Sequence, residues 1–123
     1  MKQALIVFIG GGFGSVLRYL IGRFLGNFNN LIPYGTFTVN ILGSLMIGLV
    51  LGYFAKPSIM SSNYVLILAT GFCGGFTTFS AFAYENHVFL KNGDYFSFLL
   101  YTIGSIILGL LAVFIGFYFS KVF

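Results

Sequence analysis

Residues 71–87, which read GFCGGFTTFSAFAYENH, hold most of the side chains in this sequence that could do chemistry. The pair Gly74-Gly75 interrupts a long apolar run, and hydroxyls and two phenylalanines follow at once. Irregular backbone is tolerated at membrane depth only where protein buries it or where it lines a cavity. We therefore expect a membrane helix to break at Gly74-Gly75, with a permeation or binding site beside the break.

Such a break would place two helix ends in the middle of the membrane. The half before it would end in unpaired carbonyls, and the half after it would begin with free N–H groups. Thr77, Thr78 and Ser80 can accept hydrogen bonds from those N–H groups. Transporters hold cations and anions at ends of this kind. The segment is a candidate for adjacent cation and anion sites, and a glycine kink without any ion is the alternative.

Three further side chains suit an anion. Phe79 and Phe82 are neighbours on one helix face, and the positive edges of their rings can contact an anion without holding it tightly. Packing against lipid or core is the alternative, because the chain has 17 phenylalanines. Asn40 places a carboxamide at mid-membrane, where it is costly unless paired, and its NH2 group can donate to an anion.

The charged residues in this region each have a second interpretation. Arg18 either extends to the membrane interface or draws anions toward a vestibule. Glu85 and His87 are expected at the interface, near the end of the third helix and paired with a basic residue. One histidine and two acidic residues support neither a metal-ligand set nor a Ser/His/Asp triad, so we expect no enzyme.

The elements that must position these residues are membrane helices. The sequence is 59% hydrophobic and 7% charged, whereas a soluble domain has about 25% charged residues. Four apolar runs are each long enough to span a bilayer, which takes about 20 helical residues. They are Ala4–Leu25, Tyr34–Phe54, Tyr64–Leu90 and Phe96–Ser120. We expect an all-α integral membrane protein in which residues 1–123 form a single four-helix transmembrane domain with a broken third helix.

Small and polar residues recur at every fourth position of two helices. The rows are Thr36, Asn40, Ser44, Gly48 and Gly52 in the second helix, and Ser97, Tyr101, Ser105 and Gly109 in the fourth. Such a row either joins helices or lines a narrow polar path, and two rows beside a broken helix favour the path. Glycine pairs four residues apart allow close packing within the chain or between subunits. They are Gly10/Gly14, Gly22/Gly26, Gly48/Gly52 and Gly71/Gly75.

The connections and their charges suggest how the chain inserts. Turn-like residues lie at Phe28–Pro33 and Lys91–Asp94, and Pro57 follows the second helix. Basic residues are almost balanced between the two sides: Lys2, Lys56 and Lys121 against Arg23, Lys91 and the deeper Arg18. Because this balance gives no clear topology, we hypothesise that the chain inserts in both orientations and pairs antiparallel. The net charge of +4 is spread over the helix ends, which suggests lipid head groups rather than nucleic acid as its partner.

Three stretches resemble the small bacterial Fluc/CrcB fluoride channels. They are GGGFGSVLRYLIG at residues 10–22, GTFTVNILGS at 35–44 and GFCGGFTTFSAFAYE at 71–85. The resemblance covers all four helices. It implies a passive, selective channel that exports cytoplasmic fluoride across the bacterial cytoplasmic (inner) membrane and confers fluoride resistance. It also implies a dual-topology antiparallel homodimer with two pores and a structural Na+ at the interface.

The resemblance also implies roles for individual residues. It places Asn40, Phe79 and Phe82 in the fluoride pore, with Ser80, Tyr101 and Ser105 as a track of hydroxyls. It assigns the backbone carbonyls of Gly74 and Thr77 to Na+, Arg18 to anion attraction in a vestibule, and Thr78 and Glu85 to supporting roles. Two other classes are a proton-coupled multidrug exporter, which needs a membrane-embedded carboxylate, and a structural membrane subunit without transport. Flux measurements in liposomes would separate all three.

Overall fold

The structure is a computed structural model that describes residues 1–26, 32–56 and 62–123. Its helices are α1 (Lys2–Gly26), α2 (Tyr34–Phe54), α3 (Ser62–Val65), the π-helix η1 (Leu66–Cys73), α4 (Gly74–Phe76), α5 (Phe79–Lys91) and α6 (Tyr95–Val122). The third span runs from α3 to α5. In the described part of the chain, four helical spans are long and apolar enough to cross a membrane, which confirms the predicted all-α membrane fold.

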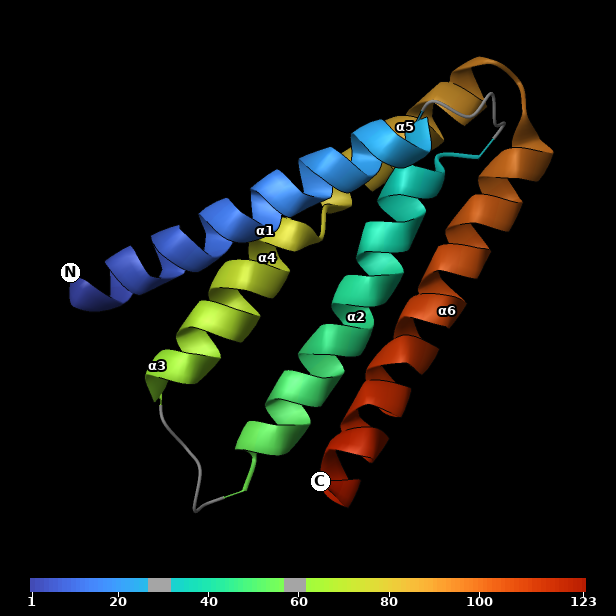
Figure 1. Ribbon diagram of the computed structural model, residues 1–123. Coiled ribbons are helices and arrows are strands. Elements are labelled where there is room, and N and C mark those ends of the chain that lie inside the picture. Colours follow the sequence, from blue (N-terminus) through green and yellow to red (C-terminus); the bar gives the residue numbers. More distant parts are fainter. Residues whose placement is uncertain (27–31, 57–61) are drawn as a thin grey trace.

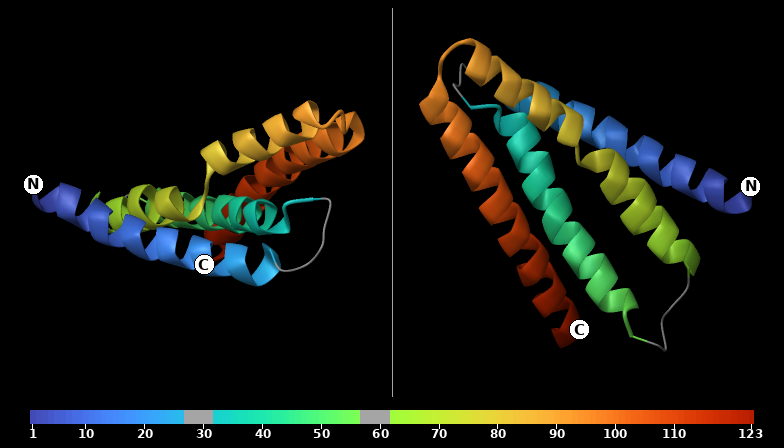
Figure 2. Two further views of the ribbon diagram at one scale, coloured as in Figure 1. Left: turned by 90° about the horizontal axis from the view of Figure 1, so that it is seen from above. Right: turned by 180° about the vertical axis from the view of Figure 1, so that it is seen from behind.

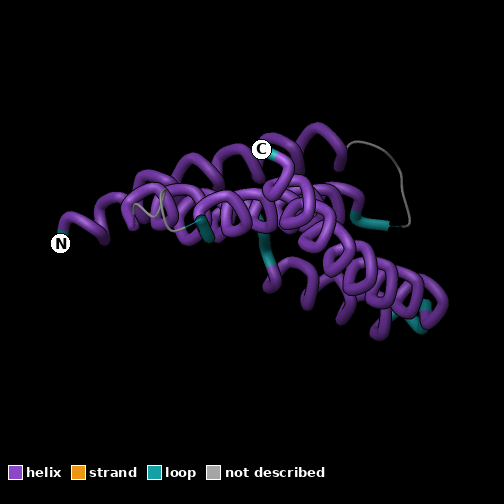
Figure 3. Tube along the Cα trace, turned by 90° about the horizontal axis from the view of Figure 1, so that it is seen from below, coloured by secondary structure: helices purple, strands orange, loops and turns teal. Residues whose placement is uncertain are grey.

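The spans pack as two pairs, and α2 of one pair also contacts both members of the other. The most extensive contact joins α2 to α6, while α1 packs on η1 and α4. Figure 1 shows α2 and α6 running in the same direction, with α1 crossing the first half of the third span. After the break the chain steps sideways, so α5 lies apart from η1 and beside the first half of α6 (Figures 2 and 3).

The break lies at Thr77-Thr78, so the prediction of a break at Gly74-Gly75 was wrong. Gly74 is helical, with φ −63° and ψ −39°, whereas Thr77 and Thr78 are extended, with ψ of 158° and 112°. Branching at Cβ favours extended backbone. The hydroxyls also close both helix ends, because Thr77 Oγ1 donates to Cys73 O (2.9 Å) and Thr78 Oγ1 accepts from Ala81 N (3.2 Å).

Glycines serve close helix packing instead. A Cβ on Gly75 would collide with the backbone of Gly11, and one on Gly14 would collide with the Phe72 carbonyl. Three of the predicted glycine pairs therefore pack within the chain: Gly10/Gly14 and Gly71/Gly75 between α1 and the third span, and Gly48/Gly52 against α6. The fourth pair, Gly22/Gly26, has open space where its side chains would be.

The turn between α5 and α6 follows the predicted position at Lys91–Asp94. Gly93 has a φ of +72°, which a glycine adopts easily, and Asp94 caps α6 by accepting from Ser97 N (3.1 Å). Hydrogen bonding to Ser97 lowers the pKa of the Asp94 carboxyl. Pro57 and most of the turn predicted at Phe28–Pro33 lie outside the described residues.

Candidate functional site

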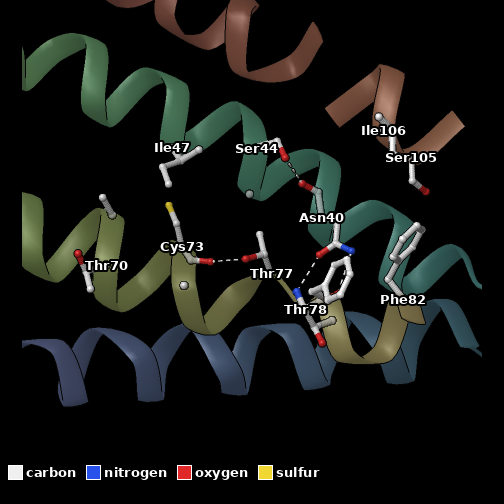
Figure 4. A pocket seen from close by; sticks show the side chains of 14 residues that line it. Asn40, Ser44, Ile47, Thr70, Cys73, Thr77, Thr78, Phe82, Ser105 and Ile106 are labelled. Carbon is white, nitrogen blue, oxygen red and sulfur yellow. Dashed lines mark hydrogen bonds between the residues drawn. The ribbon is translucent and has the colours of Figure 1, made fainter. Parts of the chain in front are cut away.

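The extended link at the break is held by the carboxamide of Asn40 on α2. Asn40 Nδ2 donates to Thr78 O (3.1 Å), and Thr78 N donates to Asn40 Oδ1 (2.8 Å; Figure 4). Both backbone groups of Thr78 are thereby paired, as the membrane interior requires. A carboxamide NH2 has two N–H groups, and this pairing uses one of them. Asn40 thus fixes the break and keeps a donor for a further acceptor.

Arg18 contacts the end of the first half of the third span. Its Nε donates to Gly75 O (3.0 Å), and Ser15 Oγ donates to the same carbonyl (3.3 Å). This carbonyl is therefore not unpaired, contrary to the expectation for that helix end. A positive charge at a helix C-terminus is favourable, because the helix dipole is negative there. Arg18 is thus partly buried and bonded within the protein, and it lines a cavity between α1 and α2.

Two other backbone carbonyls at the break, those of Gly74 and Thr77, accept no hydrogen bond from a side chain of the described residues. Thr78 N, which would reach Gly74 O in a continuous helix, donates to Asn40 instead. Among the hydrogen bonds that described residues make outside the helices, none uses Gly74 O or Thr77 O. Neutral carbonyl oxygens are suitable ligands for a hard cation. The two carbonyls assigned to Na+ by resemblance thus fit such an ion chemically.

The aromatic residues continue from the break into α6. The ring centroids of Phe79 and Phe82 are 5.9 Å apart, and those of Phe82 and Tyr101 are 5.1 Å apart. Phe79 is 80% exposed, whereas Tyr101 is 2% exposed. The buried ring of Tyr101 packs against Phe82, and its hydroxyl donates to Glu85. Phe79 and Phe82 both line a cavity at the break.

Glu85 is bound by hydroxyls, so the prediction of a basic partner was wrong for the described residues. Thr36 Oγ1 donates to Glu85 Oε1 (2.5 Å), and Tyr101 Oη donates to Oε2 (2.6 Å). Glu85 lies at the middle of α5 and is partly buried. The sideways step of the chain brings it between α2 and α6, which the distance along the sequence did not reveal.

The two remaining hydroxyls of the predicted track differ in their surroundings. Ser105 Oγ is buried and, among the described residues, is the buried side-chain polar atom without a hydrogen-bond partner. It lines the same cavity as Phe82 (Figure 4). Ser80 is exposed, and its Oγ lies 3.3 Å from Thr78 Oγ1. Ser105 therefore has a free hydroxyl that can serve a small ligand.

Cavities lie on both sides of the break, and Thr78 lines two of them. The central cavity, of about 470 Å³, lies between α2, the third span and α6. Seven of the predicted site residues line it: Asn40, Gly74, Thr77, Thr78, Phe79, Phe82 and Ser105. The arginine cavity, of about 510 Å³, lies between α1 and α2 and contains Arg18, Arg23, Thr36 and Thr78. A third cavity, of about 320 Å³, shares Thr36 with it and reaches Glu85.

Four polar residues at this site were not predicted as functional. Ser15 shares the Gly75 carbonyl with Arg18, and Thr36 binds Glu85. Thr36 belongs to the polar row on the second helix, which was the available signal. Asn86 and Thr102 hydrogen-bond to each other across α5 and α6 (2.9 Å). No spacing in the sequence pairs those two residues.

Comparison with known proteins identifies the family of the chain. The family model described as CrcB-like protein, Camphor Resistance (CrcB), matches residues 5–117. The fluoride-specific ion channel FluC of Gloeothece citriformis is 51% identical over 122 residues, which cover 98% of each chain. The channel of the same name from Phocaeicola vulgatus is 47% identical, covering 98% of this chain and 100% of its own. That of Leptospira interrogans is 41% identical, covering 99% of this chain and 97% of its own.

Proposed function

This chain belongs to the CrcB family, and we propose that it forms a passive, fluoride-selective channel in the bacterial cytoplasmic (inner) membrane. The family comprises ion channels rather than enzymes, and the four apolar spans make the chain a multi-pass membrane protein. Its relatives of 41–51% identity carry the name fluoride-specific ion channel.

The observation that carries the proposal is that Thr78, at the break, lines both the central and the arginine cavity. Fluoride is small and strongly hydrated, so a pore must replace its water with hydrogen-bond donors and must still release the ion. Asn40 has a spare N–H, Ser105 has a free hydroxyl, and Phe79 and Phe82 supply ring edges. The two arginines of the arginine cavity would raise the local anion concentration.

We propose further that two copies pair antiparallel around their interrupted third spans. A single copy leaves Thr70, Gly74 and Ser80 exposed, and lipid offers no hydrogen-bond partner to the polar groups of such residues. An inverted second copy would cover them and would create two equivalent pores. The near balance of basic residues between the two sides is consistent with insertion in both orientations.

A structural Na+ at that interface completes the proposal. Gly74 O and Thr77 O of each copy would hold it, since neither carbonyl is engaged within its own chain outside the helices. A bound Na+ supplies a fixed positive charge that offsets repulsion among anions and braces the two breaks. Replacing Na+ with K+ during purification should reduce both dimer stability and flux, and unchanged values of both would exclude a Na+ role.

The direction of transport follows from membrane physics. Hydrogen fluoride enters a cell in acid surroundings and dissociates inside. A potential that is negative inside then drives the anion outward through an open pore, so that neither ATP nor a coupled ion is required. The protein would thus protect its cell from fluoride.

Fluoride efflux from liposomes that contain the purified protein tests the proposal directly. We expect fluoride to leave without a pH gradient while chloride stays inside. Efflux only under a pH gradient would indicate a proton-coupled exporter, and no efflux of either ion would leave a structural role. Reporter tags at both termini test the inverted pair, and a single orientation in all molecules would exclude it.

A further inference from the structure

We propose that Asn86 and Thr102 are positioning residues that set the place of Phe82 at the central cavity by fixing α5 on α6. This inference rests on the proposed channel function. Neither residue lines the central, arginine or third cavity, so neither is expected to touch the ion.

The first argument is the burial of the Asn86 carboxamide. Asn86 is 7% exposed, in a span that crosses the membrane. Its Oδ1 accepts from Thr102 Oγ1 (2.9 Å), and its Nδ2 donates to Phe82 O (3.1 Å). A buried carboxamide is costly unless it is paired, so the partner hydroxyl fixes where Asn86 can lie. One side chain therefore joins α6 to the backbone of a pore phenylalanine.

The second argument is that α5 has few other supports. Its main packing partner is α6, and it makes little contact with α2. Two adjacent side-chain bridges connect α5 to α6: Glu85 to Tyr101 (2.6 Å) and Asn86 to Thr102 (2.9 Å). The first bridge ends in a carboxylate that also faces the third cavity. The two residues of the second bridge line none of the three cavities. We therefore assign to this bridge the role of holding α5 on α6.

The third argument concerns Phe82 itself. Its ring lies between Phe79 and Tyr101, with centroid distances of 5.9 and 5.1 Å. Tyr101 and Thr102 are consecutive on α6. The ring contact to Phe82 and the hydrogen bond to Asn86 therefore start from the same turn of α6. A small displacement of α5 along α6 would move Phe82 away from both Tyr101 and the central cavity.

The test uses the full-length protein in liposomes and the variant Thr102→Val, which removes the hydroxyl and keeps the shape. Loss of one buried hydrogen bond should lower fluoride efflux by about tenfold. Thr102→Ser, which keeps the hydroxyl, should retain the wild-type rate. Thr38→Val is the matched control, because no hydrogen bond within the described residues involves the Thr38 side chain.

A double-mutant cycle separates positioning from a general structural role. If the bridge acts through Phe82, Thr102→Val should not lower efflux further in a Phe82→Ile background. The same loss in both backgrounds, or wild-type efflux in Thr102→Val, would overturn the inference.

Hydrogen exchange provides a readout that does not require flux. Thr102→Val should speed amide exchange across residues 79–91, whereas Thr102→Ser should not. Unchanged exchange in Thr102→Val would also overturn the inference. Wild-type vesicles that retain fluoride would instead contradict the proposed function, while the exchange data would still decide whether the bridge fixes α5.

Discussion

The half of the third span before the break packs on α1 through glycines, whereas the half after it packs on α6 through hydrogen-bonding side chains. The first contact brings two backbones together, because Gly75 and Gly14 have no side chain to separate them. The second contact rests on the hydrogen bonds of Glu85 with Tyr101 and of Asn86 with Thr102, beside the ring contact of Phe82 with Tyr101. Two backbones in direct contact cannot move closer without a clash. The position of a helix held by side-chain hydrogen bonds depends instead on the few atoms that form those bonds. The first half is thus an anchor, and the second half carries residues whose positions polar bonds determine.

The most severe test of this comparison is Asn40→Asp, at the joint between the two halves. The carboxylate lacks the N–H that donates to Thr78 O, and it adds a negative charge beside the proposed anion path. Repulsion between like charges about 4 Å apart is about 4 kcal/mol near a protein surface, so fluoride efflux should fall more than about a hundredfold.

Asn63→Asp serves as the control for Asn40→Asp. Asn63 is exposed at the start of the third span, so the same change of charge occurs far from the joint. Its efflux should remain close to wild type. Wild-type efflux in Asn40→Asp would place Asn40 outside the fluoride path.

Replacing Phe79 or Phe82 by Ile probes the residues that the second half presents. Aromatic contacts are worth about 0.5–1.5 kcal/mol each, so each variant should lower efflux by roughly three- to tenfold while the proposed dimer persists. Phe82→Ile should also loosen α5, since its ring contacts Tyr101. Unchanged efflux in both variants would remove the role of the ring edges.

Gly75→Ala probes the anchored half. The added Cβ meets the Gly11 backbone, so α1 and α4 must separate, and overpacking of this kind costs about 1–3 kcal/mol. Thermal unfolding in detergent should show a lower midpoint. Gly104→Ala is the matched control, because that Cβ would meet open space. Equal midpoints for the two variants would mean that α1 and α4 are not closely packed.

The smallest effect is expected from Asp94→Asn at the turn beyond α5. The folded-state pKa of Asp94 lies below its ordinary value of 3.8, so its carboxylate stabilises the fold above that pH. This stabilisation is lost as the pH falls through the folded-state pKa. Asparagine also caps helices but does not titrate there, so the variant should lose part of the acid sensitivity of the unfolding midpoint. An identical pH dependence in both proteins would assign the sensitivity to other groups.

Part of the site could be predicted because its signal is local. Asn40, Phe79 and Phe82 stood out as polar or aromatic residues at unusual places in apolar runs, and the structure brings all three to one cavity. The location of the break could not be predicted from Gly74-Gly75, because glycine can either bend a helix or let a neighbour approach. The presence of Gly11 opposite Gly75 selects the second use, and that neighbour lies on another helix.

The partners of Glu85 and Asn86 were beyond prediction for a related reason. Each is 16 residues from its partner on α6, and their pairing depends on the turn at Gly93 and on the sideways step at Thr77-Thr78. A basic partner for Glu85 was the reasonable expectation from charge alone. The tertiary structure instead supplies two hydroxyls, which a pattern of charges does not reveal.

The sequence by itself determined that the chain is helical, crosses a membrane four times and interrupts its third span, because lipid admits few other ways to satisfy the polar backbone of an apolar segment. Only the tertiary structure decided where the interruption lies and which groups satisfy it. Asn40, Arg18 and Ser15 come from other helices to pair the freed backbone at Gly75 and Thr78. Such pairings depend on distances between spans, and these are set by packing rather than by order along the chain.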